Sequence, residues 1–149
     1  MKLHKSKSAE PFQTPVPPHQ EQDITTRYMQ RADQLTSMAL SLANELTRME
    51  TNISRMDPSI KGYKQLQKSV ERMKIHFSSC GINIVSMLGQ PYDVGLRADA
   101  EFVTDESLPM GTQIITSVMR PQINIGGMMI QKAEIIVSQN LGKDEQTQD

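Results

Sequence analysis

Few residues in this chain have side chains that commonly bind metals or act as nucleophiles. It contains three histidines and one cysteine. His4 and His19 lie near the N-terminus, and His76 and Cys80 lie in one helical segment without an acid or a second cysteine at ligand spacing. A single cysteine rules out a disulfide framework and a cysteine-based zinc site. We expect no metal site, and we predict that Cys80 is a small buried residue at a helix end rather than a nucleophile.

Acidic residues in the C-terminal half are the remaining candidates for acid–base chemistry. They fall at predicted strand edges and turns, where carboxylates are usually solvated. The chain also lacks the motifs of phosphate-binding loops, dinucleotide folds and serine hydrolases. We therefore predict a protein that is not an enzyme and that uses no cofactor. The acids considered are Asp93, Asp99, Glu101, Asp105 and Glu106.

Length and composition narrow the class of protein further. With 149 residues the chain can form one domain or two small ones, and with no tryptophan and eleven methionines its core must be aliphatic and rich in sulfur. A net charge of -1 gives no electrostatic reason for nucleic-acid binding. No apolar run has the length of a signal peptide or a membrane span. These features predict a cytoplasmic protein that binds neither nucleic acid nor membrane.

Both ends of the chain are polar. The first residues include Pro11, Pro15 and a Pro17-Pro18 pair among glutamines and glutamates. This composition offers too little apolar surface to offset the entropy lost on ordering. We predict a disordered, proline-rich arm over residues 1–21 and a disordered tail over residues 141–149.

The first half of the chain is predicted to form two helices. Between Gln22 and Ile53 there is no glycine or proline, and apolar residues recur every three or four positions, as on one face of a helix. After a break, Asp57 and Pro58 suit the N-cap and first position of a second helix. That helix repeats apolar residues at heptad spacing and ends before Gly81, the expected left-handed residue at its C-terminus.

Two helices with narrow apolar stripes cannot enclose a core alone. We therefore predict that residues 22–80 dimerise to form a four-helix bundle. The alternative is a monomer in which the seam packs on the chain's own β half. The predicted dimer-interface residues are Leu35, Leu42, Leu46, Leu66, Val70, Met73 and Phe77.

A row of basic residues follows another face of the second helix. It is interpreted either as a solvated face or as a contact for an acidic partner. Its members are Lys61, Lys64, Lys68 and Arg72.

Residues 81–140 change to short runs of apolar residues bounded by glycine and proline, which is typical of strands. Gly126 and Gly127 separate two of these runs and predict a tight hairpin, since primed turns need positive φ. The predicted fold class is therefore α+β, with a helical hairpin that forms a dimeric four-helix bundle, followed by a small antiparallel β domain. The predicted strands are residues 82–85, 100–104, 112–119, 123–125, 128–130 and 133–138.

The order of these parts, together with three short motifs, resembles the GrpE family of nucleotide exchange factors for DnaK-type heat-shock chaperones. The motifs are Gly89-Gln90-Pro91-Tyr92-Asp93-Val94-Gly95-Leu96, Arg120-Pro121-Gln122-Ile123-Asn124-Ile125-Gly126-Gly127 and Ala133-Glu134-Ile135-Ile136-Val137-Ser138. The resemblance runs from about Ala39 to Ser138. Differences from the residues usual in the family occur at Val94, Arg97, Ala98, Asp99 and Gln122.

The resemblance implies a homodimer with the β domains as wings. One wing would bind the ATPase domain of a DnaK-type chaperone and favour the open form of its nucleotide lobe, which promotes ADP release. Gly81 matches the family's glycine between bundle and wing. The alternative hypothesis is a dimeric adaptor that keeps this fold without exchange activity and recruits a partner through the proline-rich arm and the basic row. The implied chaperone-binding residues are Met119, Arg120, Pro121, Ile123 and Val137, and Met128 and Met129 are further candidates for a contact surface.

Overall fold

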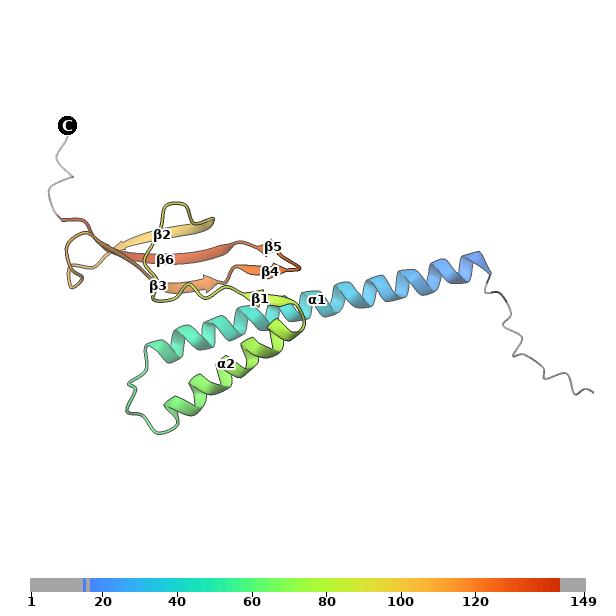
Figure 1. Cartoon of the computed structure of the whole chain (residues 1–149), viewed down its shortest axis with the longest axis horizontal. Coiled ribbons are helices and arrows are strands. Elements are labelled where there is room, and N and C mark those ends of the chain that lie inside the picture. Colours follow the sequence, from blue (N-terminus) through green and yellow to red (C-terminus); the bar gives the residue numbers. More distant parts are fainter. Residues whose placement is uncertain (1–14, 16, 143–149) are drawn as a thin grey trace, which may run out of the picture. The chain divides into compact units, whose positions relative to one another are not determined.

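The computed structural model describes residue 15 and residues 17–142 of the chain. These residues form an α+β structure with two helices and six strands in two small sheets (Figure 1). The chain divides into two units, residues 1–36 and residues 37–149. Helix α1 (Pro18–Ser54) begins in the first unit and continues into the second. Its residues within the first unit, 18–36, are all exposed.

Helix α1 corrects the predicted extent of the N-terminal arm. Its first residue is Pro18, so residues 18–21 are helical, and proline suits the first helical turn because its missing N–H needs no partner there. The rest of the predicted arm, except residues 15 and 17, lies outside the described residues. The same is true of residues 143–149 in the predicted tail.

Helix α2 (Tyr63–Ser79) packs against the second portion of α1. The contact is built around Leu46 and Ile53 of α1 and Val70 of α2, all of which are buried. Tyr63, Met73 and Phe77 are partly buried against this cluster, together with Met56 and Ile84. Part of the apolar seam is therefore covered within one chain.

The N-terminus of α2 lies later than predicted. Asp57 does accept a hydrogen bond from the backbone N–H of Ser59 at 2.9 Å, as an N-cap residue does. However, the turn that starts there ends at Gly62, whose φ of 93° is incompatible with a continuing right-handed helix. The helix begins only at Tyr63, which corrects the prediction that Pro58 occupies its first position.

Helix α2 ends before Gly81, as expected, and the φ of 77° at Gly81 is the left-handed conformation that glycine adopts without strain. The preceding residue, Cys80, is the C-cap, and it is exposed. This corrects the prediction that Cys80 is buried: the side chain belongs to the last turn of the helix, after the buried contact with α1 has ended.

Two aspartates in turns have a lowered pKa. At Asp105 the largest cause is a hydrogen bond from the Ser107 hydroxyl, followed by one from the Ser107 backbone N–H. At Asp57 the Ser59 backbone N–H comes first and its hydroxyl second. Asp57 is exposed and Asp105 is half-buried, and in both cases hydrogen bonds to the ionised form account for the direction of the shift.

We expect Ser107→Ala to raise the pKa of Asp105 toward its ordinary value of 3.8, because the hydroxyl that favours the carboxylate is lost. Since the folded-state pKa is lowered, the turn is stabilised above the unfolded-state pKa, and this stabilisation disappears as the pH falls through the folded-state pKa. Carboxyl ¹³C NMR titration measures the change, and Ser59→Ala should move only Asp57. An unchanged Asp105 titration in Ser107→Ala would contradict the assignment.

The six strands form two three-stranded sheets, in the orders β1-β4-β5 and β2-β6-β3. Gly126 and Gly127 both have positive φ and connect β4 to β5, which confirms the predicted hairpin. The strands are β1 (Ile82–Ile84), β2 (Ala98–Thr104), β3 (Thr112–Arg120), β4 (Ile123–Ile125), β5 (Met128–Gln131) and β6 (Ala133–Asn140).

One pairing corrects the prediction of an antiparallel β domain. β2 and β6 are parallel, with Ala98 opposite Ala133 and Thr104 opposite Gln139, whereas the other strand pairs are antiparallel. A parallel pair needs a long connection between its strands, and here the connection contains β3, β4 and β5.

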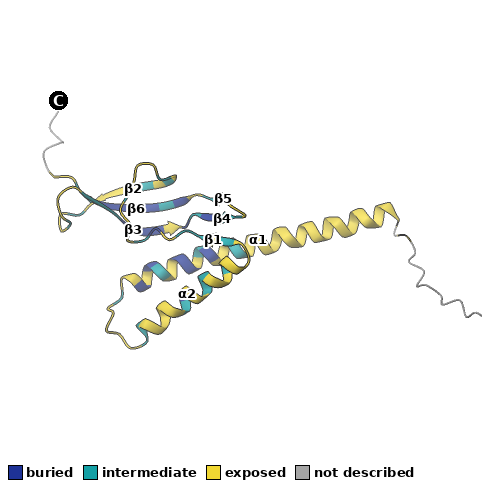
Figure 2. Ribbon diagram, in the orientation of Figure 1, coloured by how far each residue is buried: buried dark blue, intermediate teal, exposed yellow. Residues whose placement is uncertain are grey.

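The core of the β half lies against β3 and β6, whose buried residues are dark blue in Figure 2. Alternate residues of β6, namely Ala133, Ile135 and Val137, are fully buried, and they pack with the buried residues Ile115 and Val118 of β3. The segment after β1 covers this cluster with Met87, Leu88 and Tyr92, among others. The larger sheet and the segment after β1 therefore enclose one aliphatic core between them.

Candidate functional site

Strand β3 exposes a methionine at an irregularity in its pairing with β6. The register shifts between Val118 and Arg120, so that Met119 is an extra residue in the strand. Such β-bulges turn a side chain away from the direction that regular alternation would give it. Met119 is 47% exposed, and the next residue, Arg120, is exposed as well, which regular alternation along a strand would not give.

Strand β5 exposes three apolar residues in succession. Met128 is 69% exposed and Met129 39%, and Ile130 is exposed where the β4–β5 register shifts by one residue. Methionine side chains are flexible and polarizable, which suits adaptable protein contacts. We call Met119, Arg120, Met128, Met129 and Ile130 the hairpin surface.

Gln131 connects the parts of the chain that carry the hairpin surface. Its amide nitrogen donates to Pro121 O and to Asn44 Oδ1 of α1, each at 2.8 Å. Its amide oxygen accepts a hydrogen bond from Arg120 at 3.0 Å. The last residue of β5 is thus bonded to the β3–β4 corner and to α1, which fixes the two exposed segments relative to each other.

The electrostatics of this surface are weak. Arg120 also lies 3.7 Å from Glu134, but both side chains are about half exposed. An ion pair in such a position contributes on the order of 0–1 kcal/mol. Recognition at the hairpin surface would therefore depend mainly on burial of its apolar side chains.

The five residues that the resemblance assigns to chaperone binding differ in their exposure to solvent. Met119 and Arg120 are exposed, whereas Pro121, Ile123 and Val137 are fully buried within the chain. Pro121 and Ile123 lie at the start of β4, and Val137 lies in the core of the larger sheet. In the single chain these three side chains are therefore covered, and a role for them in chaperone binding stays a prediction.

The predicted dimer-interface residues also differ in their exposure to solvent. Leu46 and Val70 are buried within the chain, and Met73 and Phe77 are partly buried. Leu42, at 52% exposure, and Leu66, at 41%, face solvent, as does Leu35 in the first unit. Together with Met38 and Met49 on α1, these exposed residues leave apolar surface on both helices that the described chain does not cover.

The basic row is exposed along its length. Its first member, Lys61, lies in the turn before α2 and not on the helix as predicted, whereas the other three members lie on α2. No salt bridge to Lys61, Lys64, Lys68 or Arg72 occurs within residues 17–142, and Arg72 donates to Ser69 at 3.4 Å. In the same part of the chain, no three histidine, cysteine or acidic residues gather as a metal site would require.

Two features of the candidate site were missed from the sequence. The role of Gln131 has no sequence signal, because its partners lie up to 87 positions away. Ile130 had a signal: Met128-Met129-Ile130 breaks the alternation expected of a half-buried strand. Three consecutive apolar residues after a glycine turn could have identified an exposed edge.

Comparison with known protein families gave no matching family model, and no curated protein matches the chain either. Of the helices within the described residues, none is both long enough and apolar enough to cross a membrane.

Proposed function

We propose that this protein is a GrpE-like co-chaperone that binds the ATPase domain of a DnaK-type chaperone and promotes ADP release. The observation that carries the proposal is the sequence of parts: a long helix, an antiparallel second helix, a glycine junction at Gly81, and a two-sheet β unit with an exposed methionine hairpin. This arrangement agrees with the resemblance in the Gly-x-Pro-aromatic-Asp, Arg-Pro and closing-strand motifs.

The mechanism requires no chemistry by the protein itself. If the chain binds the open form of the nucleotide lobe more tightly than the closed form, it must lower ADP affinity by the same factor, because the two binding equilibria are linked. We infer that the hairpin surface makes the contact and that the uncovered apolar residues of α1 and α2 form a homodimer. Burial of exposed methionines and leucines would supply the affinity of each interface.

Calorimetric titration of an ATPase domain from the same cell tests this linkage. Affinity for the chain should fall when the domain is saturated with ADP, by roughly 5 to 150 fold for a coupling of about 1 to 3 kcal/mol. The double variant Met128→Ser, Met129→Ser should bind about tenfold more weakly or worse, since it loses two apolar side chains of the interface.

Met110→Ser is the matched control, because Met110 is 72% exposed in the turn before β3 and lies outside the hairpin surface. It should bind as the wild type does. Unchanged binding by the Met128, Met129 variant would remove the hairpin surface from the proposal.

The second candidate is a dimeric adaptor that keeps this fold without exchange activity. The exposed basic row on α2, which has no acidic partner within the described residues, favours it as a contact for an acidic protein. Reversing Lys64 and Lys68 to glutamate should leave ADP release unchanged under the first candidate and abolish partner recruitment under the second.

A further inference from the structure

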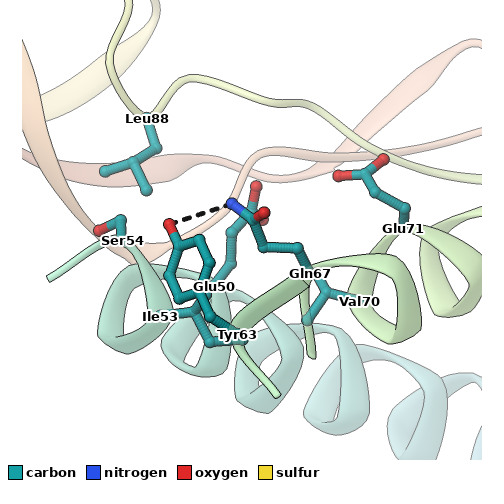
Figure 3. Close-up of a pocket in the computed structure, with 8 residues that line it drawn as sticks. All are labelled: Glu50, Ile53, Ser54, Tyr63, Gln67, Val70, Glu71 and Leu88. Atoms are coloured by element: carbon teal, nitrogen blue, oxygen red, sulfur yellow. Dashed lines mark hydrogen bonds between the residues drawn. The ribbon is translucent and has the colours of Figure 1, made fainter. Parts of the chain in front are cut away.

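A pocket of about 470 Å³ lies between the end of α1, the start of α2 and the segment after β1. Ile53 and Val70 are buried at its base, and Leu88 faces them from the segment above (Figure 3). The Tyr63 ring forms a side wall. The volume lies within the range of small-molecule sites. The pocket has apolar residues at its base and polar side chains around them, namely Glu50, Ser54, Gln67 and Glu71.

Two carboxylates line the pocket, and their surroundings differ. Glu50 Oε1 accepts a hydrogen bond from Lys74 Nζ at 2.7 Å, and Lys74 also donates to Ser86 at 3.2 Å. Glu50 is therefore already neutralised. Glu71 has no hydrogen bond or ion pair within residues 17–142, and its carboxylate extends from α2 beside the opening (Figure 3).

A hydrogen bond between two side chains positions the aromatic wall of the pocket. Gln67 Nε2 donates to the Tyr63 hydroxyl oxygen at 3.1 Å, across one turn of α2 (Figure 3). This bond directs the Tyr63 ring along the pocket wall. The site thus combines an apolar base, an aromatic wall and a carboxylate without a partner. Carboxylates only accept hydrogen bonds when ionised, so the complementary ligand must donate.

We propose that this pocket binds an alkylammonium or alkylguanidinium group. The aliphatic stem lies on Ile53, Val70 and Leu88, and the cationic head pairs with Glu71. With Glu50 offset by Lys74, the remaining charge of the site is that of Glu71, so a single positive charge neutralises it. An anionic ligand would be repelled by the Glu71 carboxylate. A neutral alcohol would leave the charge of Glu71 without a counter-charge.

NMR titration of the full chain with agmatine and with pentylamine tests the proposal. Methyl resonances of Ile53, Val70 and Leu88 should shift in a saturable manner, while those of Ile115 in the β core should not. Pentanol and pentanoate, with the same stem length as pentylamine, should bind several-fold more weakly. Added sodium chloride should weaken the binding of both cations, because the Glu71 carboxylate is exposed.

The variant Glu71→Gln should weaken agmatine binding by about threefold or more, as loss of a partly exposed charge pair does. Glu101→Gln, an exposed carboxylate on β2, is the matched control and should have no effect. Equal binding of pentanol and pentylamine, or unchanged binding in Glu71→Gln with dispersed, native-like resonances, would overturn the proposal.

A short peptide with one arginine identifies the source of the cation. If it binds at the same methyl groups more tightly than agmatine does, the natural occupant is a side chain of a partner protein. If agmatine binds more tightly, the occupant is a free amine. If neither the peptide nor agmatine shifts the pocket methyl groups, the site does not bind cations.

Discussion

The double variant Leu42→Asp, Leu66→Asp is expected to be a monomer of 16.8 kDa by light scattering, whereas the wild type should have about twice that mass. Both leucines are exposed in the single chain, one on each helix, so the substitutions leave the contact around Leu46 and Val70 intact. In a two-fold dimer each substitution occurs twice, and four unpaired carboxylates would be buried. Each such burial costs several kcal/mol.

The matched control places aspartate at the preceding positions, Ser41 and Gln65, which are exposed on the same helices. Consecutive helical residues point about 100° apart, so these changes add the same charge away from the uncovered leucines. The control should remain dimeric. A dimeric Leu42, Leu66 variant, or a monomeric wild type, would remove dimerisation through this surface from the account.

Ile115→Ala is expected to lower the free energy of unfolding by about 2 to 5 kcal/mol. Ile115 is 0% exposed, lies opposite Val137 on β6 and contributes to the cluster that closes the β half. Removing its side chain leaves a cavity that the surrounding strands cannot fill, because the Ile115 backbone is held in place on both sides. Its carbonyl oxygen accepts a hydrogen bond from the Gly89 N–H, and its N–H donates to the Gln90 carbonyl oxygen.

Urea unfolding at one fixed protein concentration measures this loss, since the stability of a dimer depends on concentration. Ile130→Ala is the control with the same chemical change at a half-exposed position, and it should cost less than about 1 kcal/mol. If the two variants lowered the free energy of unfolding equally, the β core would not be centred on Ile115.

Local patterns in the sequence predicted much of this fold. The absence of glycine and proline between Gln22 and Ile53 anticipated one long helix, and Gly126-Gly127 anticipated the β4–β5 hairpin. These features can be predicted because they follow from the conformational preferences of residues that are close together in the sequence. Of the strand limits, those of β4 were predicted without error.

Features that depend on distant residues could not be predicted. The parallel pairing of β2 with β6 brings together segments separated by three other strands, and strand periodicity does not encode the partner. The heptad seam gave no means of separating buried Val70 from exposed Leu66, because both lie on the apolar side of α2. Likewise, the sequence did not indicate that Pro121, Ile123 and Val137 are buried within the chain.

Stopped-flow measurement of labelled ADP release from the ATPase domain of a DnaK-type chaperone, taken from the same cell, tests the proposed function most directly. The account predicts that the wild-type chain accelerates release in a saturable manner, and that the Met128→Ser, Met129→Ser variant does so only at higher concentrations. An unchanged release rate at saturating chain, with every DnaK-type chaperone of that cell, would contradict it.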